Sequence, residues 1–196
     1  MVIESVNENR TNDEQLIKGF LDGNCDDFNM LYERYKRQLY SYLNRLLPGQ
    51  AALADDIFQQ TWIKVVNELP RYKNKEKFLA WIMRIAHNMA VDHFRKFKHE
   101  NNAVPIEDNQ DVLFDKNSEP WRELDRESLS KALNWALDQL SPELKEVFIL
   151  RQEGIAFKDI AEIQKSSINT VLGRMQYALK NLQELLSEWK KRGELK

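Results

Sequence analysis

The stretch FLAWIMRIAHNMAVDHFRKFK, residues 78–98, decides the fold, because it reads as one long helix with two unlike faces. Phe78, Ile82, Ile85, Met89 and Phe94 recur at helical spacing and form an apolar stripe. Such a stripe could lie in a lipid surface, but three helical segments precede it and need an apolar partner. We therefore expect this helix to be one member of a helical bundle, with its other face left for a ligand.

The composition of the whole chain favours an all-α protein. Among 196 residues there are only 6 glycines and 5 prolines, with 42% hydrophobic and 31% charged residues. The single cysteine, Cys25, excludes an internal disulfide and a cysteine-based zinc site. No apolar run approaches the roughly 20 residues of a membrane span. The first ten residues, MVIESVNENR, are too polar for a signal peptide, so we expect a cytoplasmic protein without membrane insertion.

Two small helical domains are expected on either side of a polar connector. Apolar periodicity and helix-ending residues place four helices within residues 12–98, the first opened by a capping box at residues 11–14. Residues 99–125 have no helical period and are rich in carboxylates, which predicts an acidic linker. Residues 126–190 return to helical spacing and form the second domain.

The second domain has the pattern of a helix-turn-helix. Ser141 and Pro142 fit an N-cap and a first helical residue, and Gly154 fits the end of that helix. A short helix at residues 157–164 is followed by a tight turn and a long helix that begins at a Ser167 cap. An ordinary packing of three helices is the alternative.

Charge is unevenly distributed along the chain, although the formal net charge is only -2. Basic residues dominate from residue 71 to residue 98, where only Glu76 and Asp92 are acidic, and carboxylates dominate residues 100–127. A basic helix followed by an acidic connector indicates a polyanionic partner for the first domain.

The histidines do not form a catalytic or metal-binding pattern. His87 and His93 are six residues apart, so they lie on different faces of a helix and cannot bind one metal together. The sequence also has no glycine-rich phosphate loop and no Ser/His/Asp order. We expect no enzymatic activity, no cofactor and no metal, with histidines that face solvent or phosphate.

The polar face of the helix at residues 78–98, with the loop before it, mixes aromatic rings, amides and cations. Aromatic rings stack unpaired bases, amides bond base edges, and Lys and Arg neutralise phosphates. This mixture suits single-stranded or opened DNA better than a closed duplex; the alternative is a solvated basic face with Trp81 in the core. The residues concerned are Lys75, Lys77, Trp81, Arg84, Asn88, Arg95 and Lys96.

Residues 26–97 and 136–186 resemble the two helical domains of bacterial RNA polymerase sigma factors, in the small extracytoplasmic-function (ECF) form. The resemblance rests on three stretches that keep the family's order and spacing: DDIFQQTWIKVV, FLAWIMRIAHNMAVDHFRK and LSPELKEVFILRQEGIAFKDIAEIQKSSINTVLGRMQYAL. It implies a transcription initiation factor with a sigma region 2 domain at residues 12–98 and a region 4 domain at residues 126–190. Such a factor would bind core RNA polymerase, recognise the −10 and −35 promoter elements and promote DNA melting.

The resemblance also implies partners and contact residues. One set would dock on the β′ clamp coiled coil, a second would hold the melted −10 strand, and a third would meet the −35 element. The second domain would also bind the β flap, and an anti-sigma factor is implied as a regulator. The core-binding set is Asp55, Asp56, Gln59, Trp62 and Lys64; the −10 set is Asn74, Lys75, Lys77, Trp81, Arg84, Asn88 and Arg95; the −35 set is Lys165, Ser167, Asn169, Thr170 and Arg174.

The chain departs from the family in the −35 helix. Lys165 and Ser166 occupy the turn, where the family usually has glycine, and few basic residues follow Ser167. We therefore hypothesise that −35 binding by this domain depends only weakly on salt, and a steep measured slope would contradict this. Two alternatives stay open: a stand-alone DNA-binding regulator, which would not co-purify with core polymerase, and a protein-binding adaptor without DNA affinity.

Overall fold

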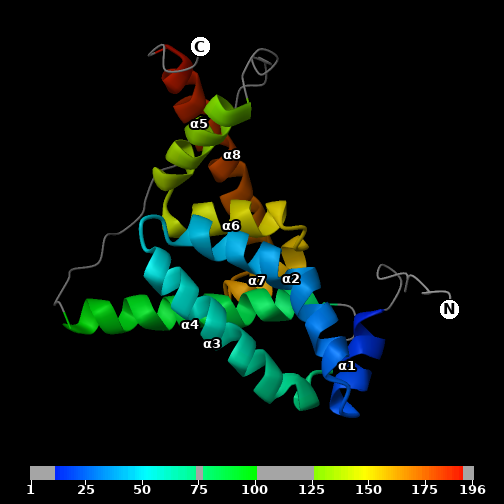
Figure 1. Ribbon diagram of the computed structural model, residues 1–196. Helices are drawn as coiled ribbons and strands as arrows, with labels where there is room; N and C mark the ends of the chain where they lie inside the picture. The colour runs from blue at the N-terminus through cyan, green and yellow to red at the C-terminus, as the bar shows by residue number, and fades with distance from the viewer. Residues whose placement is uncertain (1–11, 74–76, 101–125, 192–196) are drawn as a thin grey trace.

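The chain forms an all-α structure, which confirms the predicted fold class (Figure 1). The computed structural model describes residues 12–73, 77–100 and 126–191, and contains no strand within those ranges. The first group of helices is α1 (Asp13–Leu21), α2 (Cys25–Leu46), α3 (Ala51–Glu68), the short 3-10 helix η1 (Leu69–Arg71) and α4 (Phe78–Glu100). The second is α5 (Arg126–Asp138), α6 (Pro142–Gln152), α7 (Phe157–Ile163) and α8 (Ile168–Lys191).

The helix ends follow local sequence signals, with two corrections. Asn12, and not Thr11, is the N-cap of α1, and its Oδ1 accepts from the Glu14 N–H at 3.3 Å; Thr11 lies outside the described residues. Ser141 is the N-cap of α6 as predicted, but its hydroxyl makes no capping bond. The Ser167 cap of α8 is confirmed, since its Oγ accepts from the Thr170 N–H at 3.0 Å.

The apolar stripe of α4 packs into the first group of helices, as its spacing predicts. Phe78, Ile82 and Ile85 are buried against α2 and α3, beside fully buried residues such as Leu39. Phe94 is the exception, because 43% of it is exposed. It follows Met89 by five residues, and five helical steps turn a side chain away from the stripe.

The second group has its own small core, and it also shares a core with the first. Ala132, Leu137 and Leu182 belong to a cluster formed by α5, α6, α8 and the turn between α5 and α6. Val147 of α6 and Ile160 of α7, however, belong to the same buried cluster as the residues of α1–α4. The two groups of helices are therefore held together by a continuous apolar interior.

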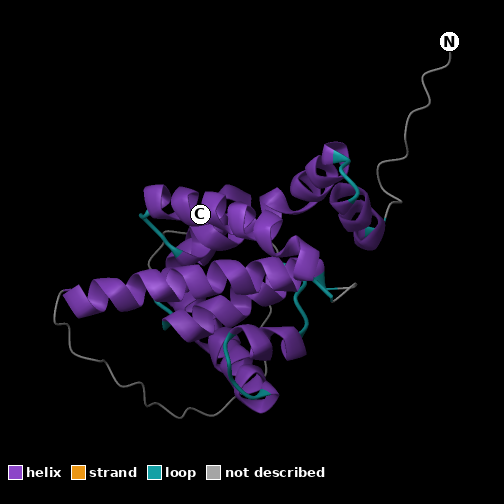
Figure 2. Ribbon diagram, turned by 90° about the horizontal axis from the view of Figure 1, so that it is seen from below, coloured by secondary structure: helices purple, strands orange, loops and turns teal. Residues whose placement is uncertain are grey.

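Two helix pairs make the contact between the groups. α6 lies against α2, and α7 lies against α4 (Figure 1). The view turned by 90° shows that the described segments are helices joined by short loops (Figure 2). The predicted linker, residues 99–125, falls almost wholly outside the described residues, so its role and the domain limits stay predictions. Among the described helices, none combines the length and the hydropathy needed to cross a membrane.

Candidate nucleic-acid interface

A polar stripe begins just before α4 and runs along the side of the helix that flanks its apolar stripe, about 100° round the helix axis. Lys77, Trp81, Arg84, Asn88 and Arg95 are separated by four, three, four and seven residues, which keeps them on one helix face. Arg84 and Arg95 are exposed, whereas Lys77, Trp81 and Asn88 are half-buried. The structure thus brings together the described members of the predicted −10 set. Asn74 and Lys75 lie outside the described residues.

An aromatic cluster fixes the position of Trp81 in this stripe. The ring centroid of Trp81 lies 4.7 Å from that of Tyr72 and 5.6 Å from that of Phe78. Phe78 is buried and anchors the cluster to the core. Burial raises the pKa of Tyr72 to about 12, so its ring stays neutral at physiological pH. Trp81 is therefore neither a core residue nor a free surface residue, but a braced ring at the edge of the core.

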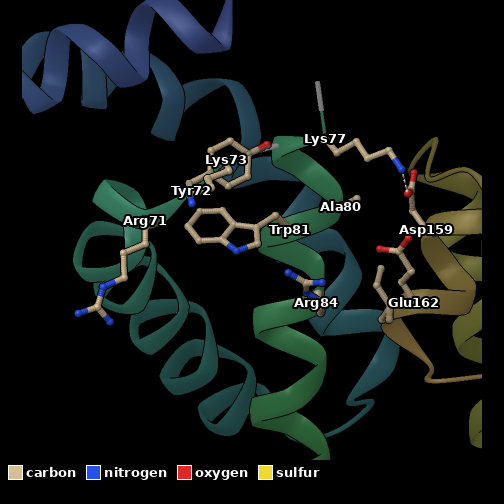
Figure 3. Close-up of a pocket in the computed structure, with 10 residues that line it drawn as sticks. Arg71, Tyr72, Lys73, Lys77, Ala80, Trp81, Arg84, Asp159 and Glu162 are labelled. Carbon is tan, nitrogen blue, oxygen red and sulfur yellow. Dashed lines mark hydrogen bonds and ion pairs between the residues drawn. The ribbon is translucent and has the colours of Figure 1, made fainter. Parts of the chain in front are cut away.

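A cavity of about 210 Å³ opens beside Trp81 (Figure 3). Its first wall, from η1, the loop that follows it and α4, carries the cations Arg71, Lys73 and Arg84 around the aromatic rings. Its second wall comes from α7 of the other helix group, which contributes Asp159 and Glu162. A cationic wall thus faces an acidic one across the contact between the two groups.

Sequence reasoning missed the acidic wall. Asp159 and Glu162 are three residues apart on α7, so they share a helix face, and that spacing was the available signal. Lys77 donates a hydrogen bond to Asp159 Oδ1 and forms an ion pair with it. This hydrogen bond raises the pKa of Lys77. One of the predicted DNA-contacting cations is thus already paired with a carboxylate of the same chain.

Glu146 of α6 is the centre of a buried polar junction between the groups. Glu146 is only 5% exposed, and three side chains form hydrogen bonds with its carboxylate. Tyr42 donates to Oε1 at 2.5 Å, His87 Nδ1 lies 2.7 Å from Oε1, and Gln164 donates to Oε2 at 2.9 Å. Because an ionised carboxylate only accepts, His87 is the donor in its pair.

The junction fixes the charge state of Glu146. Burial acts to raise the pKa of this carboxyl group, but the bonds from His87, Tyr42 and Gln164 outweigh it and lower the pKa overall. Burial and the nearby Glu146 raise the pKa of Tyr42 well above its usual value, so the phenol remains a donor. His87 was predicted to face solvent or phosphate; that prediction was wrong, because α6 covers it.

The predicted core-polymerase set lies on α3, with one correction. Asp55, Asp56, Gln59 and Lys64 are exposed, and Asp55 accepts from the Tyr40 hydroxyl at 2.9 Å. Trp62 is only 6% exposed and packs edge-on against Tyr32, so it is part of the core beneath this face. Ile63 was not predicted, yet it is 62% exposed beside Lys64.

The predicted −35 set lies on the turn and first helical turns of the α7–α8 unit. Lys165, in the turn, has a positive φ of 51°, and Lys165, Ser167, Asn169 and Thr170 are all exposed. Arg174 does not join them, because its guanidinium donates to Gln164 Oε1 at 2.8 Å. The described side chains contain no group of three potential metal ligands.

Comparison with known proteins agrees with this geometry. Residues 31–100, which include α4 and its polar stripe, match the Sigma-70 region 2 family. RNA polymerase sigma factor CarQ of Myxococcus xanthus is 31% identical over 177 residues, covering 86% of this chain and 94% of CarQ. The ECF RNA polymerase sigma-E factor of Haemophilus influenzae is 27% identical over 171 residues, which cover 83% of this chain and 89% of that factor.

Solved structures share the fold. The sigma factor RpoE of Bartonella quintana, solved in complex with the anti-sigma factor NepR, superposes with a TM-score of 0.63 at 24% identity. The match covers 82% of this chain and 97% of that one. CnrH, solved in complex with the cytosolic domain of CnrY, superposes with a TM-score of 0.64 at 22% identity. That match covers 90% of this chain and 97% of CnrH.

A region 2 helical domain joined to a helix-turn-helix unit defines the class of proteins that direct RNA polymerase to promoters. The chain belongs to the RNA polymerase sigma factor family, in its ECF group.

Proposed function

We propose that this protein is a transcription initiation factor that joins core RNA polymerase, recognises −10 and −35 promoter elements and promotes melting of the DNA. The observation that carries the proposal is the stripe of cations and a braced indole along α4, from Lys77 to Arg95. The domain limits proposed with it are residues 12–98 for region 2, 99–125 for the linker and 126–190 for region 4. It acts as a binding factor and carries out no covalent chemistry.

The −10 element would be held as a single strand on this stripe. A base that leaves the duplex loses a few kcal/mol of stacking, and an aromatic ring that stacks it returns about 1–3 kcal/mol. Trp81 supplies that ring, and Asn88 supplies an amide for a base edge. Arg84 and Arg95 neutralise the phosphates, so melting needs no chemistry beyond capture of the open strand. The family resemblance adds Asn74 and Lys75 to this surface.

Core polymerase would dock on the exposed face of α3, on the β′ clamp coiled coil. Asp55, Asp56, Gln59 and Lys64 provide polar contacts, and the exposed Ile63 provides an apolar one. Trp62 supports this face from below. The α7–α8 unit would bind the β flap and the −35 element, and an anti-sigma factor would compete for these surfaces.

The proposal is tested by run-off transcription with bacterial core polymerase on a pool of promoter fragments. We expect start sites that appear only when the protein is added, and weaker initiation when Arg84 and Arg95 are both replaced by alanine. Lys18→Ala is the matched control, because Lys18 is an exposed cation on α1 outside the stripe. Absence of protein-dependent initiation and of binding to core would instead support a stand-alone regulator.

A further inference from the structure

The outward face of α8, the second helix of the helix-turn-helix, is apolar and amide in character. Ile168, Asn169, Leu172, Gln176 and Leu179 fall within an arc of about 100° on a helix of 3.6 residues per turn. All five are exposed, with Ile168 at 46%, Leu172 at 39% and Leu179 at 44%. A different side of α8 carries Val171, Ala178 and Leu182 into the cores.

This face carries no charged side chain between Ile168 and Leu179. Arg174 lies on a different side of the helix and is bonded to Gln164, whose amide nitrogen in turn bonds Glu146. The nearest exposed cations that precede α8 in the chain are Lys158 on α7 and Lys165 in the turn, and neither belongs to this face. Their charges suit phosphates, which position a protein on DNA without reading its sequence.

The backbone of α8 is also open to a close partner at a point next to the edge of this face. A Cβ atom built at Gly173 would meet nothing within 4 Å. Gly173 therefore does not serve packing inside the protein. Its lack of a side chain lets the helix backbone approach a neighbouring surface closely, as in a DNA groove.

The chemistry of the face selects among base pairs. In the major groove, guanine is read most often by a bidentate Arg or Lys, adenine by a bidentate Asn or Gln, and thymine by apolar contact with its methyl group. We infer that α8 reads A·T pairs of the upstream promoter element. Ile168 and Leu172 contact thymine methyl groups, and Asn169 and Gln176 bond adenine edges. This inference rests on the proposed function and adds the sequence class that the second domain recognises.

The test replaces thymine by deoxyuridine, which removes only the C5 methyl group. Promoters obtained from the run-off pool are rebuilt with deoxyuridine at single positions of the −35 element, and initiation is measured with core polymerase and the full-length protein. We expect initiation to fall about fourfold for each contacted methyl group, from ~0.8 kcal/mol for one buried CH₂ group. Deoxyuridine in the spacer between the two elements is the matched DNA control.

Protein variants assign the effect to residues. Leu172→Ala should reduce initiation on the thymine promoter and make it insensitive to deoxyuridine at one position. Leu21→Ala, at an apolar residue of α1 that is 47% exposed, should leave the deoxyuridine effect unchanged. Leu172→Arg should raise initiation on promoters with guanine at that position.

The outcomes separate this inference from the proposed function. Protein-dependent initiation that is insensitive to deoxyuridine throughout the −35 element, or a selected element rich in G·C pairs, would overturn the inference and leave the function standing. A complete lack of protein-dependent initiation would overturn both.

Discussion

Glu146 shows how a single buried carboxylate can link two groups of helices. Isolated in an apolar interior, a carboxyl group would be neutral. Here the hydrogen bonds from Tyr42, His87 and Gln164 keep it ionised and lower its pKa. Two of those donors, Tyr42 and His87, belong to the first group of helices, so the ionised state depends on the contact between the groups.

Replacing Glu146 by glutamine should destabilise the folded protein by about 1–3 kcal/mol at neutral pH, since three partners lose a charged acceptor. Because the pKa of Glu146 is lower in the folded state, its contribution to the free energy of unfolding is complete above the ordinary pKa of glutamate. This contribution is lost as the pH falls through the lowered pKa. Urea unfolding at pH 7 and at acid pH should therefore show the difference between wild type and Glu146→Gln shrinking as the pH falls.

Glu143→Gln is the matched control, because Glu143 is an exposed carboxylate on the same helix and no described side chain bonds its carboxyl group. It should change stability by less than about 0.5 kcal/mol. A Glu146→Gln protein as stable as wild type at pH 7 would show that burial of the charge cancels the gain from its three bonds.

Trp81 should contribute to strand capture more than to folding, because it is only half-buried. With Trp81→Ala, we expect the open promoter complex to weaken by about 1–3 kcal/mol, the value of one base–aromatic stack. Permanganate reactivity of unpaired thymines around the −10 element would measure the open fraction. Trp81→Phe should recover part of the loss; equal loss for both variants would argue against stacking.

Among the helices, two glycines should respond in opposite ways when they are replaced by alanine: one substitution should stabilise the protein and the other should destabilise it. Gly173 lies inside α8 with space around it, so Gly173→Ala should stabilise the protein by up to about 1 kcal/mol through helix propensity. Gly154 ends α6 with φ at 88°, so Gly154→Ala should destabilise it by about 1–2 kcal/mol. Thermal unfolding of the pair measures both effects.

The Gly173→Ala variant also tests whether DNA approaches the backbone of α8 closely. If Gly173 is needed for close contact, Gly173→Ala should initiate less well on promoters that depend on the −35 element, despite its greater stability. Unchanged initiation by Gly173→Ala would show that DNA does not approach the backbone there.

Helices and their inward faces could be predicted from the sequence, because a period of 3.6 residues is a local property. The polar stripe of α4 was predicted for the same reason, and Lys77 to Arg95 lie on one face as expected.

The residues that pack against a helix face could not be predicted in this way, because they come from distant parts of the chain. His87 looked solvated because its partner Glu146 is 59 residues away in the chain, and the acidic wall of Asp159 and Glu162 could be placed only by the fold. Trp62 was assigned to the docking face, and packing places it in the core beneath that face.

In the molecule as a whole, the contact between α4 and α7 covers one end of the proposed −10 surface. Asp159 and Glu162 stand where strand phosphates would approach the cations of α4, and Lys77 is paired with Asp159. If the proposed function holds, we expect a strand to reach Lys77 and Arg84 only when α7 moves away from α4.

Removing the acidic wall should strengthen binding of single-stranded DNA by the free protein. We expect Glu162→Gln to raise the affinity for a −10 oligonucleotide several-fold at low salt, with a larger effect for the double variant Asp159→Asn, Glu162→Gln. Fluorescence anisotropy in a salt series measures this. Glu143→Gln, which removes a carboxylate from α6 outside the cavity, is the control for net charge. Equal affinity for all three variants would show that α7 does not compete with the strand.

The Trp135–Trp189 pair gives the second group of helices an optical signature of its own. The two ring centroids lie 4.8 Å apart, with one indole on α5 and the other in the last turn of α8. At that separation their electronic transitions couple, so the pair should give an exciton couplet in circular dichroism that vanishes when α5 leaves α8. The ring contacts of Trp62 and Trp81, in the first group, are with tyrosine and phenylalanine instead. Separation of α5 from α8 can thus be followed by circular dichroism, without any added label.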